Sequence, residues 1–527
     1  MIMKRYGVQL MTVVILLAMT VTTFGQLDER VMRNMAVEAE NLPAELTEEN
    51  LLWKKEYASK HVYMQPVIVG DNILLGGQAN MYTPEDGRKN KSRAVFYCVD
   101  RNTGETKWFL QAGMKGPWWT THGWVAQPWI EGERIYTLTA DGVAMCLDMD
   151  GLADGNDGIQ TEAEWANVDK LTDKDADIIW QYPFRKEHHI ECEDAHSASP
   201  LVYGDLLIFG TGHSKGVKPT RAWTKPENFE KWKYQQRPNL LALDKNTGEL
   251  VAKDELVIDE VYHGQWSSPV LVPNGDKDPV LVWADGNGYL HGLALPPQEK
   301  EGDSPHAFKP LWKIDINPKE YRYDESGEPY LFPLHKSTME EKAHGPYHSI
   351  GTPVYVNGKL YVTLGRDHYY AEKGRDEVTR GRMLNKGALL CIDMSNPEKI
   401  TEDNIIWDNR IRVTQATPSI VDGLLYIADS FGTFHCIDAE TGETVWTHDA
   451  GSDITCRSPI VADGKAYVST DKKKLFVLKA GREKEVLFED EIDSWTATPG
   501  IGDGIVVLSS SRSTRAFVNK ADSDAQN

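Results

Sequence analysis

Short apolar, β-rich segments recur in pairs along the chain, and each pair follows a proline. Within a pair, a turn that carries Gly or Asp separates the two segments, as in QPVIVGDNILL around Pro66. A sheet made from one such copy cannot bury both of its faces alone, so short-strand repeats of this length predict a radial β-propeller. The eight copies begin at Pro66, Pro128, Pro200, Pro269, Pro353, Pro418, Pro459 and Pro499.

A second signature follows the paired segments and is clearest in VDRNTGETKW (99–108) and IDAETGETVW (437–446). Asp can bond the backbone of a turn and Gly supplies positive φ, so Asp-x-x-Thr-Gly predicts a hairpin turn. The Trp eight residues after the Asp is predicted to lie on an outer strand and to pack between blades. The same place after longer or altered turns is taken by Trp180, Trp312 and Trp407.

The ends of the repeat array predict how the ring closes. Trp53, in LLWKKEY, precedes the first repeat, whereas the last repeat ends at RAFVNK without a Trp strand. Strand 51–57 should therefore complete the last blade and leave no free sheet edge. The expected fold is all-β: an eight-bladed β-propeller of four-stranded antiparallel blades over residues 51–520, closed by an N-terminal strand that completes the last blade.

Four of the six cysteines share one position in their repeats, two residues before the Asp that ends a strand. We predict that they are small buried core residues, because equivalent sites in different blades lie further apart than the ~7 Å between Cα atoms that a disulfide allows. They are Cys98, Cys146, Cys391 and Cys436.

The start of the chain and its charge indicate where it works. Residues 1–25 contain Lys4 and Arg5 and then an apolar run shorter than the ~20 residues of a membrane span, which predicts a cleaved signal peptide and a periplasmic or secreted protein. Residues 26–50 are an acidic N-terminal arm, and 521–527 are predicted to be a disordered tail. The net charge of −22 argues against a general nucleic-acid binder, and we expect no membrane span.

The Thr-Gly turns and the Trp residues after them resemble the pyrroloquinoline quinone (PQQ) repeat of bacterial quinoprotein alcohol dehydrogenases and of the propeller lipoprotein of outer-membrane assembly. The resemblance is specific for the fold and not for the chemistry. It implies a flat, anionic quinone lying on a Trp across the propeller axis, with Ca²⁺ and a catalytic Asp beside it, so PQQ and calcium are the expected cofactors. The chain lacks an adjacent Cys pair and a Cys-x-x-Cys-His haem motif, and no residue maps onto a defined calcium or base position of that family.

Polar and aromatic residues gather just before the repeat prolines, at the start of the innermost strands. Five histidines take equivalent places in five blades, namely His61, His122, His196, His263 and His348. The ligand-binding candidates at this axial mouth are Trp118, Trp119, His122, Trp124, His196, His263, Gln265, Trp266, His348, Arg457 and Trp495. The nearest acidic candidates for catalysis are Glu193 and Asp194.

Three interpretations of this group compete. In a planar ligand site, the Trp rings stack on the ligand, Arg457 pairs with an anionic group, and His or Asp accepts a proton. In a metal centre, neutral imidazoles are the ligands. In the third interpretation, the histidines only hydrogen-bond neighbouring blades and hold the inner strands in register.

Insertions distinguish the two faces of the ring. Long insertions, among them 78–93 and the Lys- and Arg-rich 211–239, are predicted to rise around the mouth, where they either steer an anionic ligand or only keep the surface soluble. The segment 148–178 replaces a Thr-Gly turn and belongs on the opposite face. Its carboxylates suit either Ca²⁺ coordination or a solvated acidic loop, and they are Asp148, Asp150, Asp154 and Asp157.

The leading hypothesis is an exported quinoprotein-like propeller that binds a small anionic ligand at its mouth, with PQQ-dependent oxidation of alcohols or sugars as the enzymatic version. The alternative is a non-enzymatic interaction propeller of the cell envelope with protein partners, similar to the assembly lipoprotein without its lipid anchor. A third hypothesis is a binder of acidic glycans, for which the mouth Trp residues would be sugar platforms.

Overall fold

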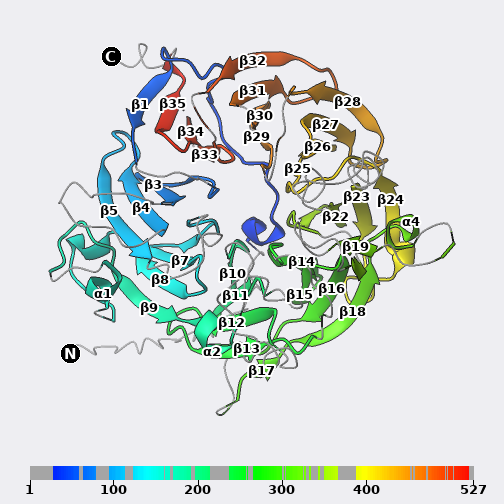
Figure 1. Cartoon of the computed structure of the whole chain (residues 1–527), viewed down its shortest axis with the longest axis horizontal. Helices are drawn as coiled ribbons and strands as arrows, with labels where there is room; N and C mark the ends of the chain where they lie inside the picture. The colour runs from blue at the N-terminus through cyan, green and yellow to red at the C-terminus, as the bar shows by residue number, and fades with distance from the viewer. Residues whose placement is uncertain are drawn as a thin grey trace, which may run out of the picture.

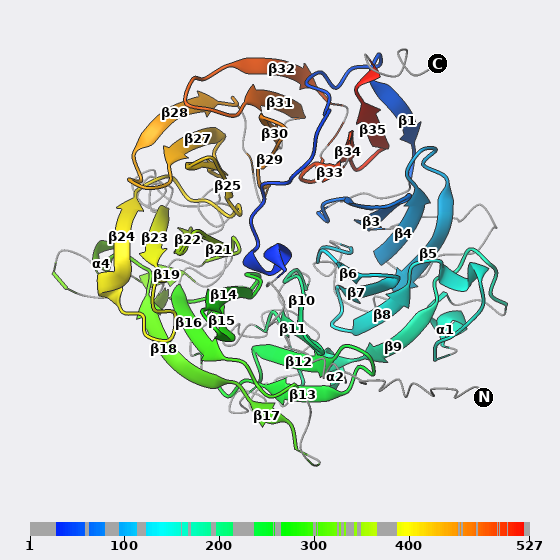
Figure 2. The same cartoon turned by 180° about the vertical axis from the view of Figure 1, so that it is seen from behind.

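Eight sheets surround one central axis in the computed structural model of the chain, as Figures 1 and 2 show. The predicted eight-bladed β-propeller is confirmed. The structure describes residues 28–520 except 58–62, 79–93, 113–122, 160, 167–169, 191–195, 214–236, 257, 259–264, 299–301, 303, 324–325, 328–330, 334–341, 345–348, 366–386, 452–453, 455–456, 471–472, 493, 495 and 503.

The first four blades each place four antiparallel strands in chain order from the axis outward. Blade 1 contains β2 (Val67–Val69), β3 (Asn72–Gly77), β4 (Ala94–Asp100) and β5 (Thr106–Ala112). Blade 2 contains β6 (Trp129–Glu131), β7 (Arg134–Leu138), β8 (Ala144–Asp148) and β9 (Ile178–Tyr182). Blade 3 contains β10 (Leu201–Tyr203), β11 (Leu206–Gly210), β12 (Leu240–Asp244) and β13 (Leu250–Lys253). Blade 4 contains β14 (Val270–Asn274), β15 (Lys277–Ala284), β16 (Tyr289–Ala294) and β18 (Lys309–Asp315).

The next three blades follow the same order, and the last one takes its outer strand from the N-terminal part of the chain. Blade 5 contains β21 (Val354–Val356), β22 (Lys359–Leu364), β23 (Ala388–Asp393) and β24 (Ile405–Asn409). Blade 6 contains β25 (Ser419–Val421), β26 (Leu424–Ala428), β27 (Thr433–Asp438) and β28 (Thr444–Asp449). Blade 7 contains β29 (Ile460–Ala462), β30 (Lys465–Ser469), β31 (Lys474–Lys479) and β32 (Val486–Glu491). Blade 8 contains β33 (Gly500–Gly502), β34 (Ile505–Ser509), β35 (Thr514–Val518) and β1 (Leu51–Lys55).

Few elements lie outside these blade strands. A short strand, β17 (His306–Ala307), adds to blade 3 by pairing parallel with β13, and β19 (Leu331–Pro333) pairs with β20 (Lys342–His344). The helices are short, and none in the described ranges is long and apolar enough to cross a membrane. They are η1 (Glu29–Met32), η3 (Gly151–Ala153), α1 (Glu162–Ala166), α2 (Phe184–Glu187), α4 (Lys319–Arg322) and η4 (Glu402–Asn404).

The core lies between the blades, and this explains why inner strands are apolar without alternation. In β12, the four residues from Leu240 to Leu243 are all fully buried. One face of the strand packs on the preceding blade and the other face on the next blade, so neither face needs polar residues. One cluster of buried side chains accordingly joins blades 2, 3 and 4.

Strand β1 closes the ring as the outer strand of blade 8. It pairs antiparallel with β35, with Trp53 opposite Ala516 and Lys55 opposite Thr514. Hydrogen bonds between the two ends of the repeat array therefore hold the ring shut and remove its free edge. The predicted closure by an N-terminal strand is confirmed.

The outer-strand Trp residues join six of the eight blades to the next one, and such packing between blades was predicted. A small residue stands opposite the Trp on the third strand, such as Cys98 opposite Trp108 and Gly292 opposite Trp312. The indole N–H then donates to a backbone carbonyl of the following blade in these pairs: Trp53 to Arg101 (2.7 Å), Trp108 to Met149 (2.7 Å), Trp180 to Lys245 (2.8 Å), Trp312 to Pro397 (2.7 Å), Trp407 to Ala439 (3.2 Å) and Trp446 to Gly481 (2.9 Å).

The glycine of the Thr-Gly turn lies directly against the Trp of the preceding blade. Gly104 has a φ of +68°, and a Cβ there would come within 2.7 Å of the Trp53 ring. Gly442 meets Trp407 in the same way, at 2.5 Å. The turn therefore requires glycine for two reasons, the left-handed backbone and the space that the ring occupies.

The four repeat cysteines are buried and free, as predicted. Burial raises the pKa of the Cys98 thiol to about 12, so this thiol stays protonated and unreactive at neutral pH. Each of the four lies opposite an outer-strand Trp in the strand pairing: Cys98 opposite Trp108, Cys146 opposite Trp180, Cys391 opposite Trp407 and Cys436 opposite Trp446. Their role is to leave room for an indole ring.

A circle of hydrogen bonds ties the blades together around the axis through the residue that precedes each repeat proline. We call this circle the collar, and it runs from Gln127 N–H to Ser199 Oγ (3.0 Å), Ser199 to Ser268 (2.9 Å), Ser268 to Thr352 (3.3 Å), Thr352 to Thr417 (3.0 Å), Thr417 to Ser458 (2.9 Å) and Ser458 to Thr498 (3.1 Å). The Gln65 side chain completes it by donating to Pro499 O at 2.9 Å and accepting from the Gln127 side chain. The collar marks the Pro end of the axis, the face on which the inner strands begin.

Candidate functional site

The N-terminal arm, residues 28–50, crosses one face of the ring from the rim to the axis, and Figures 1 and 2 show η1 at the centre of the ring. On the face opposite the Pro end, the Leu42 amide donates to Asp463 Oδ2 at 2.9 Å. Closer to the Pro end, Val37 N–H donates to Val461 O at 2.8 Å. Asn34 exchanges two hydrogen bonds with the backbone of Ile420, at 2.7 and 2.9 Å. The acidic arm expected from the sequence thus enters the axis and contacts inner strands there.

Arg33 carries the arm to the Pro end. It follows η1 in a left-handed conformation with a φ of 64°. Its Nε donates to Pro269 O at 3.1 Å, and its Nη2 donates to Ser199 O and Pro200 O, each at 2.9 Å. Burial lowers the pKa of Arg33 to about 10, so the guanidinium is still charged at neutral pH. A cation therefore lies on the axis between blades 3 and 4.

Arg30 fixes the start of the arm to blade 2. Its guanidinium carbon lies 4.3 Å from the centroid of the Trp129 ring, and its Nη1 donates to Ile130 O at 2.8 Å. Asp28 forms an ion pair with it at 2.5 Å. The arm therefore contacts inner strands all around the axis, mainly through backbone carbonyls.

Two of the predicted mouth residues are core residues in the structure. Trp124 is fully buried, its indole N–H donates to Thr137 Oγ1 at 2.8 Å, and its ring centroid lies 5.0 Å from that of Phe96. His196 is also fully buried, and its Nε2 lies 2.6 Å from Gly210 O. Burial lowers the pKa of His196 to about 4, so its imidazole is neutral at neutral pH. Both rings are enclosed by the protein, so neither presents a face to a ligand.

Gln265 and Arg457 are buried as well, and hydrogen bonds to the protein hold both. Gln265 Nε2 donates to Asn239 Oδ1 at 3.0 Å, and its Oε1 accepts from Gly286 N–H at 3.2 Å. Arg457 is 5% exposed, and its Nε donates to Thr496 O at 2.6 Å. Of the predicted mouth residues that the structure describes, Trp266 is the one that keeps a partly exposed surface.

Other predicted site residues lie outside the described residues, so the structure does not place them. Most of the long insertions predicted to rise around the mouth fall in the same gaps. The predicted residues concerned are His61, Trp118, Trp119, His122, Glu193, Asp194, His263, His348 and Trp495.

Two buried Asp–His pairs, which the sequence analysis did not identify, lie where the second strand turns into the third. In blade 4, His291 Nε2 lies 2.8 Å from Asp285 Oδ2. In blade 6, His435 Nε2 lies 3.3 Å from Asp429 Oδ2, which also accepts from Arg412 Nε at 3.1 Å. The other oxygen of each Asp accepts two backbone N–H groups of its own turn. The spacing in DGNGYLH and DSFGTFH is the sequence signal that could have found them.

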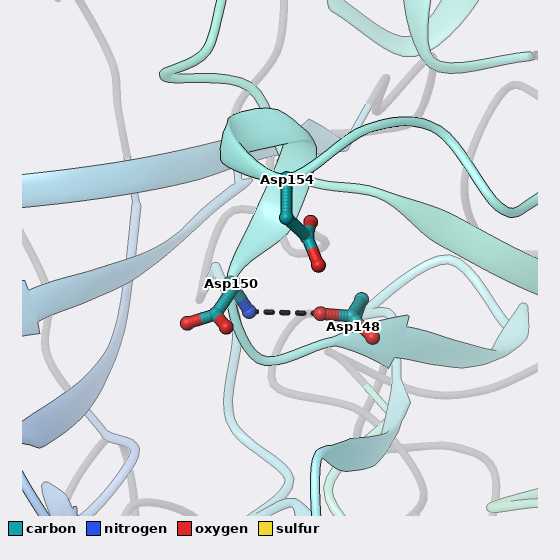
Figure 3. A group of neighbouring side chains, drawn as sticks. All are labelled: Asp148, Asp150 and Asp154. Atoms are coloured by element: carbon teal, nitrogen blue, oxygen red, sulfur yellow. Dashed lines mark hydrogen bonds between the residues drawn. The ribbon is translucent and has the colours of Figure 1, made fainter.

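The predicted calcium loop brings three of its four carboxylates together. Oxygens of Asp148, Asp150 and Asp154 lie within 4.8 Å of one another (Figure 3). Asp148 is buried while the other two are exposed. Burial raises the pKa of Asp148, and the neighbouring carboxylates of Asp154 and Asp150 add to this effect, whereas the Asp150 N–H and Arg134 act against it.

The protein itself already supplies partners to this loop. Asp148 Oδ1 accepts from the Asp150 N–H at 2.9 Å, and its Oδ2 pairs with Arg134 Nη1 at 2.6 Å. Asp157 lies outside the three-carboxylate group, and its N–H donates to Asp177 Oδ2 at 3.0 Å. The Asp148–Asp150 contact matches the one that Asp100 makes with the Asn102 N–H in a Thr-Gly turn, which the loop was predicted to replace.

A flat quinone lying across the axis does not fit the residues that the structure describes. The arm occupies that position, with η1 at the centre of the ring and Arg33 bonded to the starts of β10 and β14. Trp124, one of the predicted stacking residues, is fully buried in the core. We therefore derive no redox step for this chain.

Part of the repeat array matches the sequences of known proteins. The sequence profile of the family described as outer membrane protein assembly factor BamB matches residues 396–521, which contain blades 6 and 7 and three strands of blade 8. A quinohemoprotein alcohol dehydrogenase of Comamonas testosteroni is 29% identical over 136 residues, which are 22% of this chain and 19% of that protein. A 1-butanol dehydrogenase (cytochrome c) of Thauera butanivorans is 26% identical over 131 residues, 21% of this chain and 19% of that protein. The matches thus span about a fifth of the length of these relatives.

Solved structures agree on the architecture. BamB from Moraxella catarrhalis superimposes with a TM-score of 0.50 and 10% identity, over 89% of this chain and 98% of that one. Saccharomyces cerevisiae Sqt1 gives the same TM-score of 0.50 and the same 10% identity. Such likeness shows the fold and carries no function. Together, the matched repeats and the ring of eight blades identify the chain as a PQQ-repeat β-propeller.

Proposed function

We propose that the chain is an exported, ligand-binding propeller of the cell envelope that takes a small ligand at the Pro end of its axis, without a quinone in the axis. The observation that supports this most strongly is the course of the arm, which enters the axis from the opposite face and reaches the Pro end at Arg33. A ligand that approaches the axis therefore reaches it from the Pro end. Ligand sites combine a few placed polar groups with aromatic surface.

The described residues supply both kinds of group at this end. Arg33 provides a charged donor on the axis, and the half-buried Trp266 provides aromatic surface two residues before the collar residue Ser268. A charged donor and an indole face are what a small polar ligand with an anionic or planar part requires. Binding, orientation and exclusion of competitors are the roles that these residues can perform.

The test has two parts, and both use the purified full chain. In the first, PQQ with Ca²⁺ is titrated into the protein, and bound quinone and alcohol- or sugar-dependent dye reduction are scored. We expect neither, and stoichiometric quinone binding with turnover would contradict the proposal. In the second, small anions, sugars and alcohols are screened by thermal unfolding.

The second part of the test compares Trp266→Ala with Leu52→Ala as the matched control, since Leu52 is exposed on the outer strand β1. A ligand of this site should raise the unfolding temperature of the wild type and of Leu52→Ala, but less that of Trp266→Ala. Failure of every compound to shift the wild type would reject a small-ligand role.

The second candidate function is a protein-interaction propeller of the envelope. One observation favours it: β17 pairs parallel with the outer strand of blade 3, with Ala252 opposite His306, so an outer edge of this ring accepts an extra strand. A partner that co-purifies equally with the wild type and with Trp266→Ala, and that protects an outer strand from hydrogen exchange, would support this candidate over the first.

A further inference from the structure

We propose that Arg33 forms an anion site on the axis at the Pro end, and that the ligand taken there is a small carboxylate. This inference rests on the proposed function, because it assigns a chemical class to the ligand of that end.

The donors of Arg33 are only partly used. A guanidinium has five N–H donors in a planar fork. Nε uses its single N–H for Pro269 O, and Nη2 uses both of its own for Ser199 O and Pro200 O. Nη1 makes no hydrogen bond to the residues that the structure describes.

The planar geometry of the Arg33 guanidinium fixes where its remaining N–H donors lie. Nε and Nη2 share one edge of the guanidinium, and that edge faces the carbonyls of blades 3 and 4. Nη1 lies on the other edge, away from this wall. Because Arg33 is half-buried and not enclosed, a ligand can approach the side chain. Two N–H groups of a cation are therefore available on the axis.

The charge of Arg33 is also left without an opposite charge. All three of its acceptors are neutral carbonyl oxygens, and Asp28 of the same arm pairs with Arg30 at 2.5 Å. Within the described ranges, no carboxylate forms an ion pair with Arg33. Even partial burial of a cation without a counter-charge is destabilising, and a bound anion reduces that cost. The lowered pKa of Arg33 has burial as its cause and is consistent with this environment.

The surroundings favour a carboxylate over a doubly charged anion. A single negative charge balances the single cation, and a carboxylate oxygen forms a short charge-assisted hydrogen bond with a guanidinium N–H. A phosphate would bring additional negative charge close to the three carbonyl oxygens that already surround the guanidinium. The site should therefore prefer monoanions.

The experiment uses acetate as the probe and the full chain as the protein. Acetate replaces chloride at constant ionic strength, and thermal unfolding and calorimetric titration are followed. We expect saturable one-site binding to the wild type, a loss of at least about tenfold in affinity for Arg33→Gln, a smaller loss for Arg33→Lys, and weaker binding of inorganic phosphate. Binding should decline as the pH rises through about 10, where Arg33 loses its proton.

Asn34→Ala is the matched control for the seating of the arm. It removes the two hydrogen bonds to Ile420 and leaves the cation in place, so it should bind acetate like the wild type. If Arg33→Gln does not fold, Arg33→Lys and Asn34→Ala decide between the two roles. An equal loss of acetate affinity in these two variants would show that Arg33 only anchors the arm, and the proposal would fall.

The outcomes also separate this inference from the proposed function. No acetate binding by the wild type, or unchanged binding by Arg33→Gln, overturns the anion site. A ligand of another class that needs Trp266 but not Arg33 overturns the anion site as well and leaves the proposed function standing. Turnover with PQQ would instead overturn the proposed function.

Discussion

A single added methyl group at Gly292 should destabilise the ring at the contact between blades 4 and 5. An alanine Cβ there would lie 2.0 Å from Cε2 and 2.3 Å from Nε1 of Trp312. Carbon atoms in contact normally stand about 3.5–4.0 Å apart, so the indole ring must shift. The Trp312 N–H would then lose its 2.7 Å hydrogen bond to Pro397 O.

The expected cost follows from these two effects. Overpacking a filled core costs about 1–3 kcal/mol, and a lost hydrogen bond adds about 1 kcal/mol. We therefore expect Gly292→Ala to lower the free energy of unfolding by about 2–4 kcal/mol. The matched control is Gly210→Ala in β11, where the nearest atom to a new Cβ is 3.4 Å away and no such loss is expected.

The assay is denaturant unfolding of both variants, repeated in the Trp312→Ala background as a double-mutant cycle. Removing the indole should remove most of the cost of the extra methyl group. Equal stability of Gly292→Ala and Gly210→Ala, or an unchanged cost of the methyl group without Trp312, would refute the reasoning.

Three further predictions concern closure, pH and metal. Trp53→Ala should cost about 3–5 kcal/mol, the usual range for a buried Trp, and should expose the N-terminal segment to limited proteolysis; a variant that resists protease like the wild type would argue against closure by β1. Burial lowers the pKa of His196 from 6.5 to about 4, so only the unfolded chain takes up this proton between those values, and stability should fall as the pH drops through that window. His196→Gln should reduce that slope, and an unchanged slope would exclude His196 as its source. Calcium should leave the unfolding temperature unchanged, because both Asp148 oxygens already have protein partners; a calcium-dependent rise that Asp154→Asn abolishes would contradict this.

The features of the fold that could be predicted depend on contacts between strands close in the sequence. The prolines, the Thr-Gly turns and the Trp residues each act within one blade or on the next one, so their spacing revealed eight blades. Trp53 before the first repeat indicated the closure in the same way. Cys98 was recognisable because its repeat position requires a small side chain against Trp108.

The ligand-binding residues at the mouth were harder to predict, because the same residue types also occur in the core. Trp124 and His196 stand at the predicted inner-strand starts, yet both rings are buried. Only the three-dimensional structure distinguishes a core ring from a ligand platform. Gln265 shows the same limit, since its partner Asn239 belongs to another blade.

The arm could not be placed from the sequence for a different reason. It has no repeat and no strand pattern, and its acidic composition suggests solvent. Its position depends on carbonyl groups of several inner strands, which come together only when the ring is complete. From the sequence, Arg33 could not be distinguished from other charged residues, because its partners Ser199, Pro200 and Pro269 lie far from it in the chain.

The most direct test of the account is a crystal structure of the full chain grown with PQQ and Ca²⁺. The account predicts density for the arm along the axis, with the Arg33 guanidinium within hydrogen-bonding distance of the carbonyls of Ser199, Pro200 and Pro269. A quinone stacked across the axis, with the arm displaced from the ring, would contradict it.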